Sequence, residues 1–226
     1  QQWQDECREF LGLTPEKKPK KISIASPRSH CSHCKKPIKA HHNIPVISYI
    51  LLKGKCHHCK RPMGLLHPFV ELLTAIITLI VARHFGLNWQ MLAALVLTYL
   101  LITLAFIDLY HQILPDTLTL STLWIGLMVS SFSFQTHLSD AVWASVIGYV
   151  FLWSLAWIFL KLRKKQGMGH GDFKMLAMLG AWLGFYGMIN SLLLAILISV
   201  ISGTVFVFYK HENWSKAIPF GPYLAV

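Results

Sequence analysis

The chain has 226 residues, of which 54% are hydrophobic and 14% are charged, and its mean hydropathy is positive. This composition excludes an ordinary soluble domain and indicates a protein with several membrane-spanning helices. The formal net charge of +11 does not indicate nucleic-acid binding, because no nucleic-acid-binding module accompanies the basic residues. A basic segment beside membrane helices is instead typical of the cytoplasmic face of a lipid bilayer, near anionic headgroups.

The basic residues divide the chain into two predicted domains. Thirteen of the 21 Lys and Arg residues fall within the first 61 positions, and none lies between Arg83 and Lys161. We therefore expect a basic cytoplasmic domain over residues 1–67 and a domain of transmembrane helices over residues 68–226. The chain begins with Gln and ends inside an apolar stretch, so we expect it to be part of a longer protein and its second domain to be truncated at the C-terminus.

The basic domain opens with a predicted short amphipathic helix over residues 1–13 and continues as a polar linker. Two CxxC motifs follow, and they contain Cys31, Cys34, Cys56 and Cys59. Two residues between paired cysteines let both sulfurs reach one ion, and four thiolates are the ligands of a structural Zn²⁺ site. The alternatives are two disulfides or free thiols, but a Lys-rich segment facing the reducing cytoplasm disfavours disulfides. Four cysteine ligands leave no open coordination position, so we expect this metal to stabilise the domain rather than catalyse.

The second domain contains apolar segments of the length that a bilayer requires. The predicted spans are 68–85, 89–109, 117–134, 141–161, 173–187 and 190–209, with a further span starting near residue 219. If the cysteine domain is cytoplasmic, the connections at 110–116, 162–172 and 210–218 are cytoplasmic as well. Basic residues in or beside the last two of these connections agree with the positive-inside rule.

This topology places two distant acids at the same face of the membrane. Asp108 ends the second predicted span, and Asp172 begins the fifth. Ionisable residues at membrane depth are costly and indicate function. Two neighbouring carboxyls that share a proton can activate water and polarise a peptide carbonyl without a metal, so the pair predicts an intramembrane aspartyl protease.

The residues around these acids have predicted supporting roles. Gly169 and Gly171, in the segment GMGHGD, are expected to permit unusual backbone angles and the close approach of a substrate strand. Asp116, in the segment ILPD, is expected to cap the next helix rather than to catalyse.

These motifs together resemble one bacterial family. The matching segments are PRSHCSHCKKPI, NIPVISYILLKGKCHHCK, HPFVELL, FIDLYHQILPD, GMGHGDFKMLAMLGAWLG and PFGPYLA. They are similar to the type IV prepilin leader peptidase and N-methyltransferase family, which belongs to the GxGD class of intramembrane aspartyl proteases. The resemblance covers most of the chain from residue 28 onward.

The resemblance implies a bifunctional enzyme of the bacterial inner membrane, with its active site toward the cytoplasm. Such enzymes remove the basic leader of prepilins and pseudopilins after a Gly and methylate the new N-terminus with S-adenosylmethionine. The resemblance maps the catalytic pair onto Asp108 and Asp172, and it places methyl transfer loosely around the cytoplasmic domain. Gly54, Lys55 and Glu71, a backbone-permissive residue and two charged residues bordering the CxxC motifs, are our candidates there. Each of the three residues also has a purely structural interpretation. Gly54 would form a turn, Lys55 would be a solvated cation and Glu71 would be an acid near the start of a helix.

A different functional class is a membrane transporter or ion-binding protein whose buried Asp residues bind cations and whose zinc domain is regulatory. A transport pathway should hold its acids nearer the bilayer midplane, whereas both acids are predicted at one membrane face. No feature of the sequence predicts an oligomeric state.

Overall fold

The structure is a computed structural model that describes residues 30–31, 33–34, 36–38, 47–132, 136–164, 168–210 and 219–225. The amphipathic helix predicted over residues 1–13 lies outside the described residues. The chain divides into two compact units, Gln1–Leu73 and Thr74–Val226.

The described part of the first unit is built from short elements around the two CxxC motifs. Isolated antiparallel bridges join His30 to Pro37 and Lys55 to Pro62, so that each motif lies in a small turn closed by a bridge. Between the two motifs lies the short helix α2 (Ile47–Leu51). The unit ends within α3.

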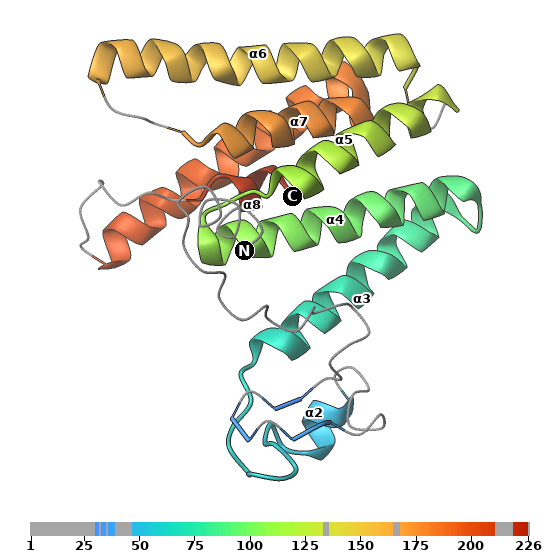
Figure 1. The fold of residues 1–226 in the computed structure, drawn as a ribbon, viewed down its shortest axis with the longest axis vertical. Helices are drawn as coiled ribbons and strands as arrows, with labels where there is room; N and C mark the ends of the chain where they lie inside the picture. Colours follow the sequence, from blue (N-terminus) through green and yellow to red (C-terminus); the bar gives the residue numbers. More distant parts are fainter. Residues whose placement is uncertain are drawn as a thin grey trace, which may run out of the picture. The chain divides into compact units, whose positions relative to one another are not determined.

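The described remainder of the chain is helical (Figure 1). Its elements are α3 (Leu66–Phe85), α4 (Trp89–His111), α5 (Asp116–Ser131), α6 (Leu138–Arg163), α7 (His170–Lys210) and α8 (Gly221–Leu224). The predicted all-α fold is therefore confirmed. Asn88 caps α4, because its side chain accepts a hydrogen bond from the Met91 backbone N–H at 2.9 Å.

Four of the described helices are long and apolar enough to cross a membrane, which is fewer than the predicted number of spans. They are Leu66–Phe85, Trp89–His111, Leu138–Arg163 and His170–Val205. The predicted span 117–134 is a 16-residue helix, α5, which at 1.5 Å per residue extends only about 24 Å and so falls short of the ~30 Å hydrocarbon core. Near residue 219, the described residues form the four-residue helix α8.

The two predicted spans 173–187 and 190–209 belong to one long helix with an internal break. The break lies at Gly184, where φ is 68° and ψ is −172°, and not at the predicted junction near residue 188. A Cβ at position 184 would lie 2.4 Å from Thr136 Cγ2. Glycine is therefore required here both for the left-handed φ and for the close approach of the α5–α6 connection.

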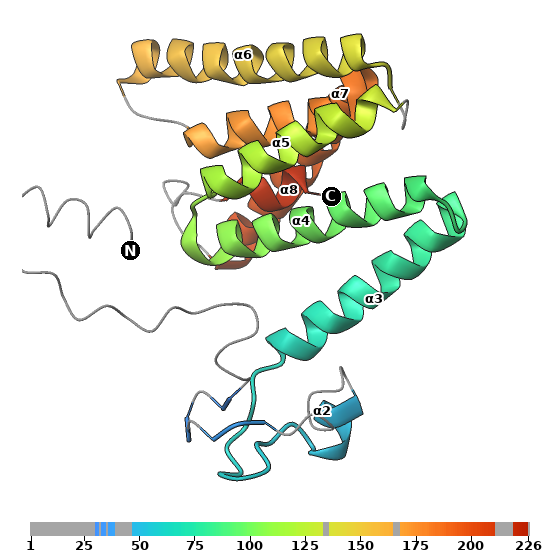
Figure 2. The ribbon, with the colours of Figure 1, turned by 45° about the vertical axis from the view of Figure 1, so that its right-hand side comes forward.

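The core of the second unit is organised around α7, which packs against α6 and α5 (Figure 2). A Cβ at Gly180 would lie 2.7 Å from a backbone atom of Ala144 in α6, so small residues allow these two helices to approach closely. On the α5 side, Trp182 Nε1 donates a hydrogen bond to the Thr122 carbonyl at 2.9 Å, and Ser130 Oγ donates one to the Ala181 carbonyl at 2.8 Å. Small-residue packing and buried hydrogen bonds thus hold the first half of α7 in a defined position.

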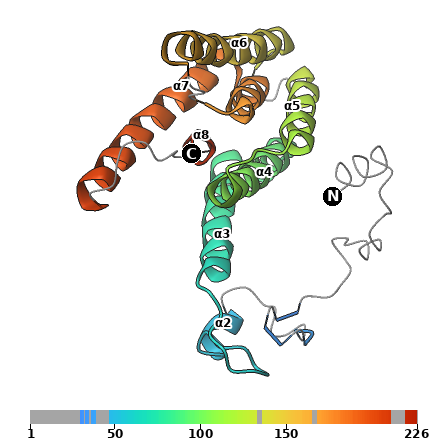
Figure 3. The ribbon, with the colours of Figure 1, turned by 60° about the vertical axis from the view of Figure 1, so that its left-hand side comes forward.

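The short helix α8 packs against both α7 and α4 (Figure 3). Ser202 Oγ in α7 donates a hydrogen bond to the Tyr223 hydroxyl in α8 at 2.8 Å, and Leu224 is buried in the core of the unit. The last described segment of the chain is therefore brought back to the helices that carry the two acids.

Candidate active site

The two acids that the sequence predicts as a pair lie near the ends of two helices. Asp108 lies in the last turn of α4, and Asp172 lies in the first turn of α7. The residues are only 6% and 8% exposed. Helix α8 packs against both α4 and α7, so the fold buries two carboxyl groups from distant parts of the sequence on helices that share a neighbour. Both lie near helix ends, which differs from the arrangement expected for a transport site at the bilayer midplane.

A third segment contacts Asp108 directly. The backbone N–H of Gly221, at the start of α8, donates a buried hydrogen bond to Asp108 Oδ2 with an N–O distance of 3.0 Å. A Cβ at position 221 would lie only 2.6 Å from this oxygen. The absence of a side chain at Gly221 is therefore what allows the backbone to approach the carboxyl group so closely.

The two glycines beside Asp172 differ from the sequence prediction in their backbone conformation. Neither Gly169 nor Gly171 is among the described glycines with positive φ, so the prediction of unusual backbone angles is wrong. Gly171 instead permits close packing, because a Cβ there would lie 2.7 Å from Leu114 Cβ. Among the described residues, a Cβ at Gly169 would meet only Asp172 Oδ2, at 3.9 Å.

Asp116 does not cap α5, and that prediction is also wrong. The N-cap residue is Pro115, no side chain caps the helix, and Asp116 is its first residue. The Lys174 Nζ atom instead donates a hydrogen bond to Asp116 Oδ1 at 2.6 Å. The side chain of Asp116 is 60% exposed. Asp116 thus joins the start of α5 to the first turns of α7, on which Asp172 lies.

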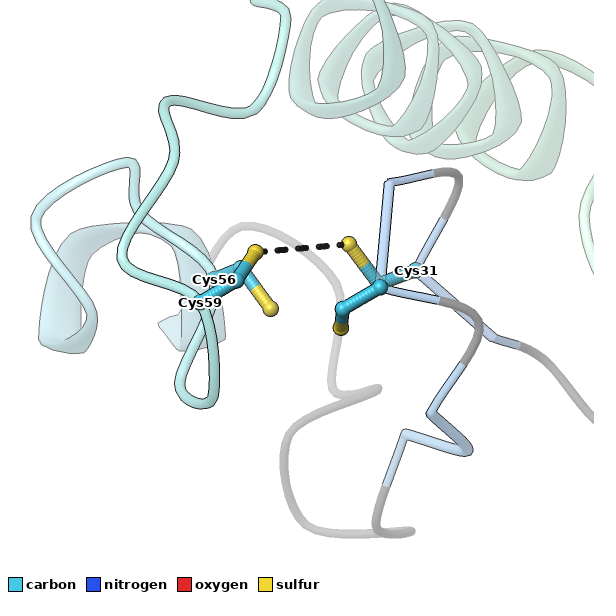
Figure 4. A group of neighbouring side chains, drawn as sticks. Cys31, Cys56 and Cys59 are labelled. Atoms are coloured by element: carbon cyan, nitrogen blue, oxygen red, sulfur yellow. Dashed lines mark hydrogen bonds between the residues drawn. The ribbon is translucent and has the colours of Figure 1, made fainter.

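In the first unit, the four predicted metal ligands converge (Figure 4). Their Sγ atoms all lie within 4.8 Å of one another, and those of Cys31 and Cys59 are 3.9 Å apart. A tetrahedral zinc ion with Zn–S bonds of about 2.3 Å would hold its sulfurs about 3.8 Å apart. All four described cysteines are free thiols, so the disulfide alternative is wrong. The cluster therefore has the geometry of a metal site.

Backbone groups of the turns favour the thiolate form that binds metal. Backbone N–H groups of Cys34 and His33 lower the pKa of the Cys31 thiol to about 6. The corresponding backbone groups of the second motif lower the pKa of Cys56. The backbone N–H of Arg61 acts on Cys59 in the same direction, but burial and the neighbouring thiols outweigh it and raise the pKa of Cys59 to about 11. The two motifs also contact each other, because Arg61 Nη1 and His33 Nδ1 lie 3.2 Å apart.

The three residues considered for methyl transfer lie near this cluster in the chain. Gly54 is buried and adopts a φ of 68°, and a Cβ there would lie 2.8 Å from Tyr49 Oη. Lys55 is exposed and bridges to Pro62, and Glu71 is half-buried in α3. The described contacts of Gly54 and Lys55 are those of a tight turn, which agrees with their structural reading.

Comparison with known proteins gives two family matches and several close relatives. Residues 7–85 match the Bacterial Peptidase A24 N-terminal domain, and residues 95–207 match the Type IV leader peptidase family. The chain belongs to the type IV leader peptidase family. The relatives named Prepilin leader peptidase/N-methyltransferase include those of Stutzerimonas stutzeri, 43% identical over 99% of this chain and 78% of the relative, and Pseudomonas aeruginosa, 44% identical over 99% and 77%. That of Aeromonas salmonicida is 44% identical over the whole chain and 78% of the relative. No solved structure matches.

Membership in this leader peptidase family agrees with the resemblance drawn from the motifs. The four candidate spans make the chain an integral membrane protein. Sequence reasoning missed the contact of Gly221 with Asp108 and the pairing of Lys174 with Asp116. The segment PFGPYLA is part of the resemblance, but nothing in its spacing relates it to Asp108.

Proposed function

We propose that this protein is a membrane aspartyl endopeptidase that removes the leader of type IV prepilins or pseudopilins and then methylates the new N-terminus. Asp108 and Asp172 are its catalytic pair. The observation that carries the assignment is that these two carboxyls, at the ends of α4 and α7, are both buried, in a chain of the type IV leader peptidase family.

The chemistry follows from two carboxyl groups and a water molecule. One carboxylate accepts a proton from the water as the water oxygen bonds to the scissile carbonyl carbon, and the other carboxyl donates a proton to the carbonyl oxygen. Collapse of the tetrahedral intermediate breaks the C–N bond, and the amine leaves with a proton from the pair. Among the described residues only Asp172 lies within 4 Å of a Cβ at Gly169, so the missing side chain there leaves a substrate backbone room to reach Asp172.

The four-cysteine cluster is assigned to a structural Zn²⁺ ion. Its sulfur–sulfur distances suit a tetrahedral thiolate site, and four thiolates leave no open position for a substrate. Its role is to hold the N-terminal unit together, so no step of peptide hydrolysis passes through it.

S-adenosylmethionine is assigned as the methyl donor, and when bound it supplies the methyl group that the new N-terminal amine accepts. We place this reaction in the basic domain, residues 1–67, and at the adjoining start of α3, near Gly54, Lys55 and Glu71. The exposed ammonium group of Lys55 suits a carboxylate ligand.

The catalytic pair lies in the transmembrane domain, residues 68–226. The membrane is the bacterial inner membrane, with the catalytic pair toward the cytoplasm, where the basic leader of the substrate lies.

The test is cleavage of a purified prepilin by membranes that contain the wild-type protein, Asp108→Asn or Asp172→Asn. Each substitution should lower the rate of leader removal by at least about a hundredfold, the smallest usual contribution of a general acid or base. Asp140→Asn is the matched control, because Asp140 is an exposed acid in the first turn of α6, and its rate should equal that of the wild type. Cleavage at the wild-type rate by either active-site variant would overturn the assignment.

Methyl transfer is measured separately with labelled S-adenosylmethionine and a mature pilin peptide that needs no cleavage. Label at the peptide N-terminus is expected with all four proteins. If the wild-type protein adds no label, the methyltransferase part of the proposal is wrong, while the peptidase part is judged by cleavage alone.

A further inference from the structure

The structure assigns a positioning role in peptide hydrolysis to the backbone N–H of Gly221, which orients the Asp108 carboxyl and is itself held in place by the hydrogen bond from Ser202 to Tyr223. This inference rests on the proposed catalytic pair and extends it to a third segment of the chain. It concerns residues that lie far from both acids in sequence.

The first observation is the contact itself. The N–H of Gly221 donates to Asp108 Oδ2 at 3.0 Å, in a buried position. A carboxyl group at the end of a side chain with two rotatable bonds has many orientations unless one of its oxygens is held. Because Oδ2 is held by a backbone group, the carboxyl group is kept in one orientation, and reactivity depends strongly on such orientation.

The second observation is the lack of space for any other residue. A Cβ at position 221 would lie 2.6 Å from Oδ2 and 3.0 Å from the carboxyl carbon of Asp108. A side chain would therefore have to displace the carboxyl group or α8 itself. The φ of Gly221 is not positive, so the requirement for glycine comes from the neighbouring carboxyl and not from the backbone conformation.

The third observation is the way in which α8 is held. The Ser202 hydroxyl donates to the Tyr223 hydroxyl at 2.8 Å, and Leu224 is 1% exposed in the core. Helix α8 also packs against α4, which carries Asp108, and against α7, which carries Asp172. The position of the Gly221 N–H relative to the pair is thus set by contacts with both helices.

The first test replaces Gly221 with alanine. Gly221→Ala should lower kcat for prepilin cleavage by about tenfold or more, with KM within about twofold of wild type, because the reacting group is misplaced while substrate binding is retained. Gly148→Ala is the matched control. A Cβ there would lie 2.6 Å from Met188 Sδ, so this variant crowds a buried glycine beside a flexible side chain, and its kcat should stay within about twofold.

The second test removes only the hydrogen-bond donor. Glycolic acid introduced at position 221 by nonsense suppression replaces the N–H with an ester oxygen and adds no side chain. A hydrogen bond to a charged group is worth enough that kcat should fall by about tenfold. This variant decides the matter if Gly221→Ala does not fold, which is judged from its melting temperature in detergent.

A third variant tests the hydrogen bond between Ser202 and Tyr223 that holds α8 against α7. Tyr223→Phe removes the acceptor of the Ser202 hydrogen bond and should lower kcat by about threefold with KM unchanged, the direction expected for loss of one neutral hydrogen bond. Wild-type kcat in the ester variant overturns the role of Gly221, as does a loss in Gly221→Ala no larger than that in Gly148→Ala. Wild-type kcat in Tyr223→Phe overturns the role of the Ser202 contact. Absence of cleavage by the wild-type protein would refute the proposed function instead, so the two failures are distinguishable.

Discussion

Asp116 and Asp108 lie in the same short segment, and replacing each by asparagine should have very different effects. The ion pair of Asp116 with Lys174 is short, at 2.6 Å, but the two side chains are 60% and 23% exposed. Water screens such a pair, and exposed pairs contribute only about 0.2–1 kcal/mol to stability. Asp116→Asn should therefore lower the free energy of unfolding by less than about 1 kcal/mol.

The exposed Asp116 and the buried Asp108 should also differ in their effect on catalysis. Because Asp116 is directed to Lys174 on the surface of the helices, Asp116→Asn should keep kcat for prepilin cleavage within about fivefold of wild type, the change in an equilibrium constant that corresponds to about 1 kcal/mol. Asp108→Asn should lower kcat by at least about a hundredfold. Asn is nearly isosteric with Asp, so the comparison isolates the charge and the proton.

The assay combines cleavage kinetics with a double-mutant cycle on stability. Asp116→Asn, Lys174→Met and the double variant are unfolded in detergent, and the coupling energy should be below about 1 kcal/mol and should shrink at high salt. A hundredfold loss of kcat in Asp116→Asn, with an unchanged free energy of unfolding, would refute the reasoning. Such a result would mean that Asp116 takes part in the reaction.

Two further predictions concern the metal cluster and the core. Removal of metal by a chelator should make the segment around Cys31 and Cys56 sensitive to limited proteolysis, because thiolate clusters lose their structure without the ion. Added Zn²⁺ should restore resistance to the protease. An unchanged proteolysis pattern would show that no metal holds the unit. Trp182→Phe should lower the free energy of unfolding by about 1–3 kcal/mol, because it removes the buried hydrogen bond to the Thr122 carbonyl and leaves the smaller ring in a site that the indole fills. Chemical unfolding in detergent measures this, and an unchanged midpoint would contradict it.

Local features of the sequence were sufficient for several conclusions. Apolar length and composition predict membrane helices because the bilayer imposes a minimum length on each span, and α4 and α6 follow their predicted ranges closely. The CxxC spacing predicts a cluster because two residues between the cysteines of each pair let both sulfurs face one point, and the four sulfurs do lie within 4.8 Å of one another.

Other features were decided by tertiary packing. The extent of α5 and the break at Gly184 depend on which helices pack together, since an apolar run looks the same whether it crosses a membrane, turns at a glycine or packs as a short helix. The length of apolar runs in the sequence therefore does not predict the number of membrane-spanning helices reliably.

In the candidate active site, too, the sequence predicts some features and tertiary packing decides others. Asp108 and Asp172 are identifiable from the sequence because a carboxylate at the end of an apolar run is costly without a function. The partner of each acid is not identifiable in this way, because Lys174 meets Asp116 and Gly221 meets Asp108 only after distant helices have packed. A hydrogen bond from a backbone N–H carries no side-chain signature, so only the tertiary structure reveals that the segment PFGP reaches Asp108.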